Sequence, residues 1–287
     1  MRHPRIVAEH ELKGAFMATV RQEQGIGQEP PRGSDNQRFD PLVSILIPCL
    51  NEEGVVGRLL GDLQANTLGD FEVVVCDNGS TDGTAAEVQR FAERDARIHL
   101  IQLGEPGVSR ARNMAARHAK GRYLLFLDAD TRLNPDFLQL ALEQMQARRL
   151  DVATFPLSVK SRRLVDHLLC GLANVIITLL SIFHPTSPGS AGYLVRREAH
   201  EHSGGYDESM HFGEDVDYLR RAAAGRRFGI IKVARCIADT RRLDLEGRWS
   251  VAKRMLLGTW YQRGGRRIRQ LPFEYRFGHY RGKKKNG

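Results

Sequence analysis

The sequence predicts an α/β protein with a mostly parallel sheet and helices on both of its faces. In the first half of the chain, short apolar runs of strand length alternate four times with segments whose apolar residues recur at helical spacing. A polar loop follows each apolar run, and this alternation is typical of parallel sheets that are covered on both faces. The 287 residues, 41% hydrophobic and 27% charged, are sufficient for a substantial core.

The first strand is expected at residues 43–47, where a β-branched apolar run ends at Pro48. Proline has no N–H to donate to a neighbouring strand, so we expect the strand to stop there and residues 48–53 to form a loop. A helix is expected after Gly54, because the next apolar residues recur at helical spacing. These residues are Val55, Val56, Leu59, Leu60 and Leu63.

Two further strands are expected at residues 71–76 and 98–102, with a helix between them. Ala85, Val88 and Phe91 would form one apolar face of that helix. The unit of strand, loop and helix therefore repeats, as a doubly covered sheet requires.

Two more helices flank the fourth strand. Residues 108–120 predict a helix that Gly121 ends, because glycine readily adopts the left-handed conformation found after helices. The helix after the strand is expected to have Asn134 as its N-cap and Pro135 at its first position.

The fourth strand itself lies in residues 123–130, where five apolar or aromatic residues lead into Asp128 and Asp130. Two positions apart in extended backbone, these carboxylates can point toward the same cleft. Hard oxygen ligands at this spacing suit Mg²⁺ or Mn²⁺ held together with substrate phosphates. The structural alternative is a strand end followed by a turn rich in Asp.

Three polar loops are expected to converge at one edge of this sheet, because parallel strands end at the same edge and such sheets bind ligands there. The loops are residues 48–53, 77–82 and 128–130. The sequence lacks a Gly-rich dinucleotide fingerprint and a P-loop, which excludes two common uses of an α/β sheet. The remaining side chains suit a nucleotide bound partly through metal, since a divalent cation reverses the repulsion between carboxylates and a diphosphate. They are Asp77, Asp82, Asp128, Asp130, Arg110, Arg112 and Asn113.

Five short motifs resemble those of glycosyltransferase family 2, the nucleotide-sugar-dependent transferases of GT-A fold. They are VSILIP with NEE at residues 43–48 and 51–53, DNGSTD at 77–82, ARN at 111–113, FLDAD at 126–130 and GED at 213–215. The resemblance implies a Rossmann-like GT-A domain over residues 42–240. It also implies inverting, metal-dependent transfer of a single sugar from a nucleoside-diphosphate sugar to an acceptor hydroxyl.

The same resemblance implies roles for individual residues. Asp215 would be the catalytic base that takes the acceptor proton, and Asp130 would ligate the Mg²⁺ or Mn²⁺ that bridges the diphosphate. Asp77 would pair with the nucleotide base, and Asp128 would lie near the ribose or the sugar. The residues expected to bind substrate are Pro48, Asn51, Glu52, Asp77, Asn78, Arg112, Asn113, Asp128 and Glu214, with Arg241 and Arg242 as a clamp for the diphosphate or the acceptor.

Purely structural roles compete with some of these assignments. Asp82 and Thr84 are better explained as caps of the following helix than as substrate contacts. Glu214, Asp215 and Asp217 lie at an expected helix start, where acidic residues favour the helix dipole. Only the resemblance gives Asp215 a catalytic role.

Two other functions stay open at this point. A sugar-phosphate nucleotidyltransferase would need a Gly-rich basic signature early in the chain, and the sequence has none. A catalytically silent protein that binds nucleotide sugars or nucleic acid could use the basic C-terminal segment. Such a protein has no need of a base, so the set of Asp128, Asp130 and Asp215 disfavours it.

The most apolar segment, residues 164–183, lies between the metal motif and the base motif. Its apolar part from 168 to 183 is shorter than the roughly 20 residues needed to span a bilayer, so we expect a buried or interfacial helix and an apolar or lipid-linked acceptor. His184 and His211 are interpreted as surface residues, and the loop 184–190 as a possible lid. The remaining expected elements are strands at 191–196, 228–233 and 236–238 and a basic amphipathic helix at 249–261.

Processive polysaccharide synthases of the family carry a QxxRW motif. Here Arg248 and Trp249 are preceded by Leu245 at the Gln position. This departure favours a single transfer over polymerisation.

The net charge of +9 is concentrated in a basic C-terminal extension, residues 241–287, whose last 26 residues contain nine Lys and Arg against Glu274. Such a segment suits an anionic membrane surface or a solvated tail, and no specific nucleic-acid partner is expected. Residues 1–41 are expected to form a flexible arm without a signal peptide. Together with four scattered cysteines, this predicts a cytoplasmic protein, placed at the inner face of the cytoplasmic membrane if its acceptor is lipid-linked or an envelope glycan.

Overall fold

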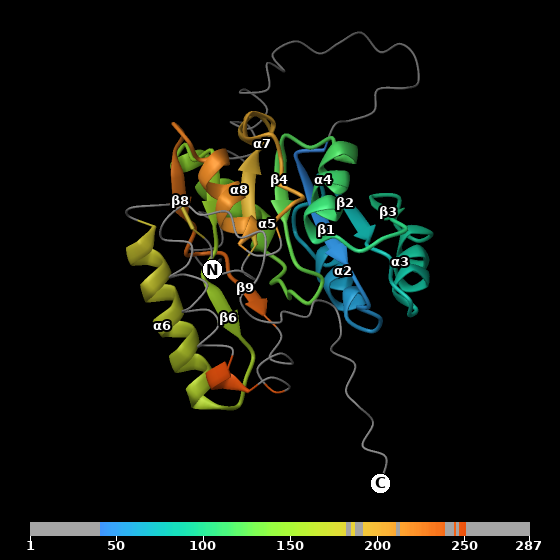
Figure 1. The fold of residues 1–287 in the computed structure, drawn as a ribbon, viewed down its shortest axis with the longest axis horizontal. Helices are drawn as coiled ribbons and strands as arrows, with labels where there is room; N and C mark the ends of the chain where they lie inside the picture. Colours follow the sequence, from blue (N-terminus) through green and yellow to red (C-terminus); the bar gives the residue numbers. More distant parts are fainter. Residues whose placement is uncertain are drawn as a thin grey trace, which may run out of the picture. The chain divides into compact units, whose positions relative to one another are not determined.

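The computed structural model describes residues 41–181, 185–186, 192–210, 213–238, 244 and 247–250. Within them, a seven-stranded sheet has the strand order β3-β2-β1-β4-β7-β5-β8 (Figure 1). Among the described strands of this sheet only β7 is antiparallel to its neighbours, so the predicted α/β class with a mostly parallel sheet is confirmed. The strands are β1 (Val43–Cys49), β2 (Phe71–Asp77), β3 (Ile98–Gln102), β4 (Tyr123–Phe126), β5 (Val152–Thr154), β7 (Tyr193–Arg196) and β8 (Phe228–Ile230).

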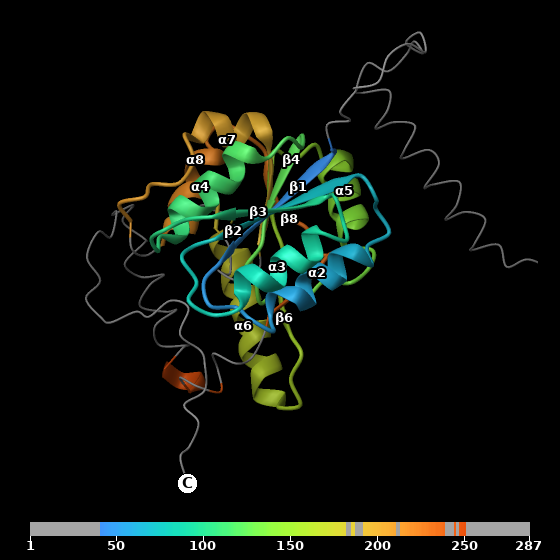
Figure 2. The ribbon, with the colours of Figure 1, turned by 90° about the vertical axis from the view of Figure 1, so that its right-hand side faces the viewer.

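Helices cover both faces of this sheet (Figure 2). The helices α2, α3 and α5 lie on one face, and α4, α7 and α8 lie on the other. Their bounds are α2 (Val56–Gln64), α3 (Thr84–Ala92), α4 (Val108–His118), α5 (Phe137–Ala147), α7 (Arg197–Ser203) and α8 (Glu214–Ala222). The four residues expected on the buried side of α2 within its bounds, at positions 56, 59, 60 and 63, are buried as predicted.

The core under α4, α7 and α8 contains a group of buried aromatic side chains. The rings of Phe126 and Tyr193 stack with centroids 5.2 Å apart, and those of Tyr206 and Tyr218 stack at 4.3 Å. Phe126 ends β4 and Tyr193 begins β7, where the two residues pair in the antiparallel register. The aromatic group therefore supports the sheet edge at which Asp128 and Asp130 leave the core.

The strand β1 continues through Pro48 to Cys49, so the expectation that Pro48 ends it is wrong. The carbonyl of Leu46 accepts the N–H of Leu127 on the β4 side, whereas the carbonyl of Cys49 accepts the N–H of Asn78 on the β2 side. Because successive residues of a strand bond to opposite neighbours, Pro48 faces the β4 side, where β4 has already ended. Its missing N–H therefore removes no bond between strands.

Two helix boundaries also differ from expectation. The helix α4 ends before Gly121 in extended backbone, so this glycine does not cap it. A Cβ at Gly121 would lie 2.5 Å from the backbone nitrogen of Ser44, so the close approach to β1 requires glycine here. The N-cap of α5 is Asp136 rather than Asn134, whose carbonyl instead accepts the N–H of Phe137 in a preceding turn.

Three elements were not expected from the sequence: β5, α7 and β6 (Leu157–Val159). Strands of three residues and a helix of seven are too short to show a clear hydrophobic period. β8 is likewise shorter than the predicted strand at residues 228–233.

A second, two-stranded sheet pairs β6 with β9 (Cys236–Ala238), and α6 (Leu164–Leu180) packs on β6. The side-chain amide of Asn174 in α6 accepts the N–H of Leu157 at 2.9 Å and donates to its carbonyl at 2.8 Å. The outer side of α6 is exposed, which excludes a buried helix. In the described part of the chain, the helices are too short or too polar to cross a membrane.

Several expectations lie wholly or mostly outside the described residues and stay predictions. They concern the arm at residues 1–41, most of the extension at 241–287, the loop at 184–190, the helix at 249–261, and the side chains of Arg241, Arg242, His184 and His211.

Candidate active site

The first two polar loops interlock at the carboxyl edge of the sheet. Asn51 adopts a positive φ of 56°, a conformation that Asn tolerates better than most residues. Its N–H donates to Ser80 Oγ, and its Oδ1 accepts the N–H of Thr81, both at 2.9 Å. The N–H of Glu52 donates to Thr84 Oγ1 at 2.8 Å. The loops after β1 and β2 thus form one fixed wall.

Asp77 and Asn78 form the floor beside this wall. Both are buried, and Asp77 is the last residue of β2, paired in register with the end of β1. One carboxylate oxygen of Asp77 accepts the N–H of Ser80 at 3.1 Å. The side-chain oxygen of Asn78 is buried and has no hydrogen-bond partner among the described residues. A buried acceptor without a partner is costly, so this oxygen is available to a hydrogen-bond donor.

Asp82 has a structural role, but neither Asp82 nor Thr84 is the N-cap of α3 as predicted, because the N-cap is Gly83 and Thr84 is the first residue of the helix. The Oδ1 of Asp82 accepts the N–H of Thr84 at 3.0 Å and the Thr84 hydroxyl at 2.5 Å, at the start of α3. Its Oδ2 accepts the N–H of Glu53 at 3.3 Å. Asp82 therefore fixes the loops and is not free to bind substrate.

Arg112 lies at the centre of a cluster of three carboxylates. Its Nη1 lies 2.7 Å from Asp215 and 3.2 Å from Glu214, and its Nη2 lies 3.1 Å from Asp128. The guanidinium also lies over the Tyr206 ring, 5.3 Å from its centroid. One side chain of α4 thus joins the end of β4 to the first turn of α8.

The burial of Arg112 changes the role expected for it. Its side chain is only 7% exposed, and its two Nη groups are occupied by carboxylates. Burial alone would lower the pKa of Arg112. The neighbouring carboxylates, above all Asp215, raise it by more, so Arg112 is charged. A buried charge is tolerated only when it is paired, as it is here. The geometry therefore makes Arg112 a residue that positions the three carboxylates, and its expected place beside the nucleotide stays a prediction.

Asp215 has the properties of a poised base. Its Oδ1 accepts hydrogen bonds from Arg112 and from the Tyr193 hydroxyl, each 2.7 Å long. Its Oδ2 accepts no hydrogen bond from any described residue, so one oxygen is left for an incoming proton. Burial raises the pKa of Asp215 to about 8, with Glu214 and Asp128 adding to the shift and Arg112 opposing it. The helix start offers a purely structural role to all three acids of the first turn, but it does not explain this burial.

Tyr193 and Tyr206 belong to the site and were missed in the sequence. Tyr193 lies in an apolar strand and Tyr206 follows a Gly-Gly pair, and neither position carries a catalytic motif. The one available signal is chemical, because a tyrosine in a buried strand usually needs a partner for its hydroxyl. For Tyr193 that partner is Asp215.

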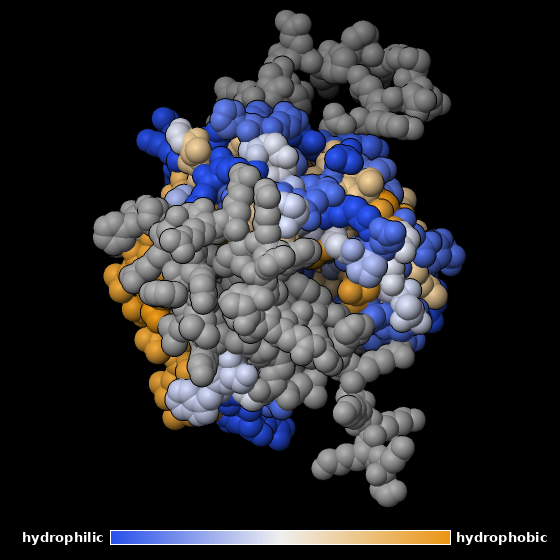
Figure 3. All heavy atoms as spheres, in the orientation of Figure 1, coloured by the Kyte–Doolittle hydropathy of each residue, from blue (hydrophilic) through white to orange (hydrophobic). Residues whose placement is uncertain are grey.

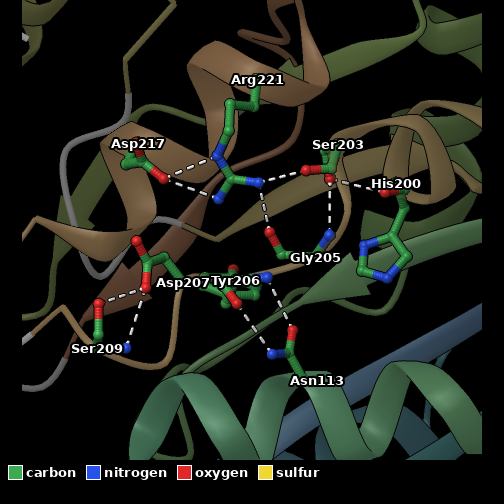
Figure 4. Close-up of polar contacts among 9 residues, drawn as sticks. All are labelled: Asn113, His200, Ser203, Gly205, Tyr206, Asp207, Ser209, Asp217 and Arg221. Carbon is green, nitrogen blue, oxygen red and sulfur yellow. Dashed lines mark hydrogen bonds and ion pairs between the residues drawn. The ribbon is translucent and has the colours of Figure 1, made fainter.

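The loop between α7 and α8 is held from both sides (Figure 4). From α4, the Asn113 amide accepts the N–H of Tyr206 at 2.8 Å and donates to its carbonyl at 3.0 Å. From α8, Arg221 pairs with Asp217 and donates to the carbonyls of Ser203 and Gly205. Asn113, expected to contact substrate, thus uses its amide to position the loop that carries Tyr206.

Asp130 lies apart from this cluster, in the wall of a cavity of about 310 Å³. The cavity is lined by Val55, Arg58, Asp130, Arg132, Leu133, Asn134, Lys160, Ile237 and Ala238. Arg132 forms a bidentate pair with Asp62, so its charge is already neutralised. Arg58 and Lys160, which line the same cavity, add positive charge to its wall.

The carboxylates of Asp128 and Asp130 are the candidate ligands for a divalent cation. Within the described residues, no three His, Cys, Asp or Glu side chains come together in a way that could hold a metal ion. Asp128 and Asp130 are hard oxygen donors separated by one residue, and Asp128 is 37% exposed. Mg²⁺ is commonly bound by one or two carboxylates together with substrate phosphates. The residues present therefore fit a cation that a diphosphate shares.

Comparison with known sequences supports the resemblance. The profile described as "Glycosyl transferase family 2" matches residues 44–165, and the one described as "Glycosyl transferase family group 2" matches residues 123–277. The uncharacterized glycosyltransferase EpsJ of Bacillus subtilis is 33% identical over 112 residues, which cover 39% of this chain and 33% of EpsJ. The chain thus spans well under half the length of the first curated relatives that it matches.

Solved structures share the fold. The mannosyltransferase PcManGT of Pyrobaculum calidifontis, in complex with GDP-Man and Mn²⁺, superposes with a TM-score of 0.60 at 22% identity, covering 89% of this chain and 73% of its own. TarS of S. aureus, in complex with UDP-GlcNAc, gives a TM-score of 0.56 at 20% identity, over 69% of this chain and 58% of that chain. At these identities the likeness establishes the GT-A architecture.

Proposed function

The chain belongs to glycosyltransferase family 2, and on that premise we propose that it transfers a single sugar from a nucleoside-diphosphate sugar to an acceptor hydroxyl. The observation that carries the proposal is the geometry of Asp215. This carboxylate is 18% exposed, has a raised pKa, and is held through one oxygen while the other accepts no bond from the described residues. A residue that only stabilised a helix start would gain nothing from a raised pKa.

In the proposed reaction, Asp215 Oδ2 takes the proton of the acceptor hydroxyl as its oxygen attacks the anomeric carbon. A bond forms between that oxygen and the carbon while the bond from the carbon to the diphosphate oxygen breaks. The electron pair leaves with the nucleoside diphosphate. Because the base and the leaving group act on opposite faces of the sugar, the configuration inverts.

Arg112 and Tyr193 support this step without touching the reacting atoms. Both bind Oδ1 of Asp215, which fixes the carboxylate and directs Oδ2 away from them. Both hydrogen bonds stabilise the charged form of Asp215, and they therefore limit how far burial raises the pKa of this residue. The base therefore stays strong and can still be deprotonated near neutral pH.

The nucleotide is assigned to the wall formed by the first two loops. Asp77 and the unpartnered oxygen of Asn78 can accept N–H groups of a nucleobase. Pro48, Asn51 and Glu52 lie at the same edge and shape the entrance. Glu214 would act through its bond to Arg112 rather than on the nucleotide.

Asp130, with Asp128 beside it, would hold Mg²⁺ or Mn²⁺ together with the diphosphate. When bound, the cation supplies a positive charge that stabilises the departing diphosphate. Arg58 and Lys160 in the same cavity would add to this, and Arg241 and Arg242 are proposed as a further clamp.

The acceptor is proposed to be lipid-linked or part of an envelope glycan, because an exposed apolar helix lies between the two halves of the site in the sequence. We also propose that the protein acts on the cytoplasmic side, at the inner face of the membrane, because a basic C-terminal extension suits anionic lipid. The altered QxxRW position supports a single transfer.

A panel of nucleoside-diphosphate sugars, each with Mg²⁺ or Mn²⁺ and with and without chelator, tests the proposal. We expect one donor to release nucleoside diphosphate, and we expect this release to stop when chelator is added. Asp130→Asn should raise the metal concentration that gives half-maximal release by about tenfold or more. Release at an unchanged rate in chelator would exclude the metal part, and no release from any donor with any candidate glycan or lipid acceptor would contradict the transfer.

A further inference from the structure

The helix α6 is amphipathic in the reverse sense of a normal surface helix. Two polar side chains face the protein: Asp166 is 1% exposed and pairs with Arg248, and Asn174 bonds the backbone of β6. Six of its large apolar side chains are exposed. A surface helix of a globular protein normally does the opposite, so the outer face of α6 is built for an apolar environment.

The outward side chains form one continuous stripe. They are Leu164, Val165, Leu168, Leu172, Val175 and Leu179, which are between 40% and 73% exposed. Spacings of three and four residues keep them on one side of a helix about 26 Å long. Figure 3 shows hydrophobic atoms along this side of the molecule, over α6. We call these six residues the α6 stripe.

An exposed tryptophan follows the arginine that binds the first turn of α6. Arg248 forms a bidentate pair with Asp166 in the first turn of α6, and Trp249 follows it with 76% of its surface exposed. Tryptophan is the side chain most typical of the boundary between lipid and water, because its ring is apolar and its N–H is polar.

The charges around the stripe are mostly positive. Lys160, Arg162 and Arg163 are exposed just before the helix. The two nearby acids, Asp166 and Asp244, are both paired with Arg248. The chain that continues from this point, residues 251–287, contains eleven Lys and Arg and one acid, Glu274. An apolar stripe flanked by cations is the pattern of an interfacial helix on anionic lipid.

From these contacts we propose that the α6 stripe, with Trp249, docks the protein on an anionic lipid bilayer with α6 lying in the plane of the interface. A second copy of the chain is the other possible occupant of such a stripe. Pairing two α6 stripes would bring two basic ends and two strongly basic C-terminal segments into one assembly, which like-charge repulsion opposes. An anionic lipid surface would bury the apolar side chains of the stripe and attract the basic residues beside it.

The docking would orient the site. α6 packs on β6, β6 pairs with β9, and β9 residues line the cavity that contains Asp130. These contacts connect the outer face of α6 to the cavity, so docking of α6 would bring the cavity near the bilayer that carries a lipid-linked acceptor. Only this last step rests on the proposed function, since binding to lipid requires no transfer.

Co-sedimentation of the full chain with vesicles tests the proposal. Vesicles of phosphatidylcholine with phosphatidylglycerol should bind the protein, and Leu168→Ser combined with Leu172→Ser should weaken binding by about 10- to 30-fold. Val233→Ser, at an apolar residue that is 54% exposed outside the stripe, is the matched control and should bind as the parent does. In a Trp260→Phe background, fluorescence from Trp249 should shift to the blue on binding.

Three outcomes would overturn the proposal. The full chain could fail to bind the anionic vesicles. The double variant could bind as tightly as the parent, which would assign binding to the basic extension alone. The parent could be a dimer that the double variant converts to a monomer, which would assign the stripe to a second copy. Asp215→Asn should bind vesicles normally, so failure of transfer and failure of docking are distinguishable.

Discussion

The guanidinium of Arg112 and the carboxylate of Asp215 meet at 2.7 Å in a place where their side chains are 7% and 18% exposed. A charged pair removed from water must be fully hydrogen-bonded to be tolerated. Here the pair is completed by Asp128 and Glu214 on Arg112 and by Tyr193 on Asp215. The arrangement fixes the Asp215 carboxylate while leaving one of its oxygens available.

The pH dependence of transfer should report the raised pKa of Asp215. Only the deprotonated carboxylate can accept the acceptor proton, so kcat/KM should rise with pH and level off above about 8. The measurement is the initial rate of nucleotide release at limiting acceptor, in buffers of constant ionic strength. A profile that is already flat at the ordinary pKa of an aspartate would show that Asp215 is not the titrating base.

Tyr193→Phe removes the hydroxyl that donates to the charged form of Asp215. The pKa of Asp215 should rise further, so the rising limb of the pH profile should move to higher pH and kcat/KM at neutral pH should fall by about tenfold. The control is Tyr123→Phe, because the Tyr123 hydroxyl is buried without a hydrogen-bond partner among the described residues. An equal loss in both variants would point to packing rather than to the bond with Asp215.

Arg112→Met should destabilise the fold strongly, because it leaves three carboxylates close together without their cation. We expect the free energy of unfolding to fall by about 3–5 kcal/mol. Arg97→Met, which breaks the more exposed pair with Asp95, should cost about 1 kcal/mol or less. Urea denaturation at neutral pH measures both, and similar losses in the two variants would refute the central position given to Arg112.

Gly205 and Gly204 offer a matched pair of substitutions in the loop before α8. Both have a positive φ, of 77° and 72°, but only at Gly205 would a Cβ meet the Asn113 side chain, at 2.8 Å. Gly204→Ala should cost about 1 kcal/mol from backbone strain alone, and Gly205→Ala about 1–3 kcal/mol more. In an Asn113→Ala background that extra cost should shrink, as a double-mutant cycle of thermal denaturation would reveal.

Features formed by residues close together in the sequence could be predicted, and contacts between residues far apart in the sequence could not. The four parallel strands before Asp130 were expected because each is a local apolar run followed by a polar loop. The structural role of Asp82 was expected for the same reason, since its bond to Thr84 spans two positions. The bond between Arg112 and Asp215 joins residues 103 positions apart, and no local pattern contains it.

Burial is the property that a single sequence conveys least well. Arg112 lies in the ARN motif, and the resemblance implied that it borders the nucleotide; its enclosure by carboxylates from two distant elements was not expected. The apolar residues of α6 suggested a core helix or an interfacial one, and the polar anchor of Asn174 on β6 determines that they face outward. In both cases long-range partners determine the orientation of the side chain.

The most direct test of the account is the rate of sugar transfer by Asp215→Asn, measured together with its affinity for the donor. Asparagine keeps the size of the side chain but cannot accept the proton, so kcat should fall by about 10²- to 10⁴-fold while the dissociation constant of the donor stays the same. Asp217→Asn, an acid of the same helical turn that pairs with Arg221, should keep near-normal transfer. Transfer by Asp215→Asn at a rate comparable to that of the parent would contradict the assignment of Asp215 as the base.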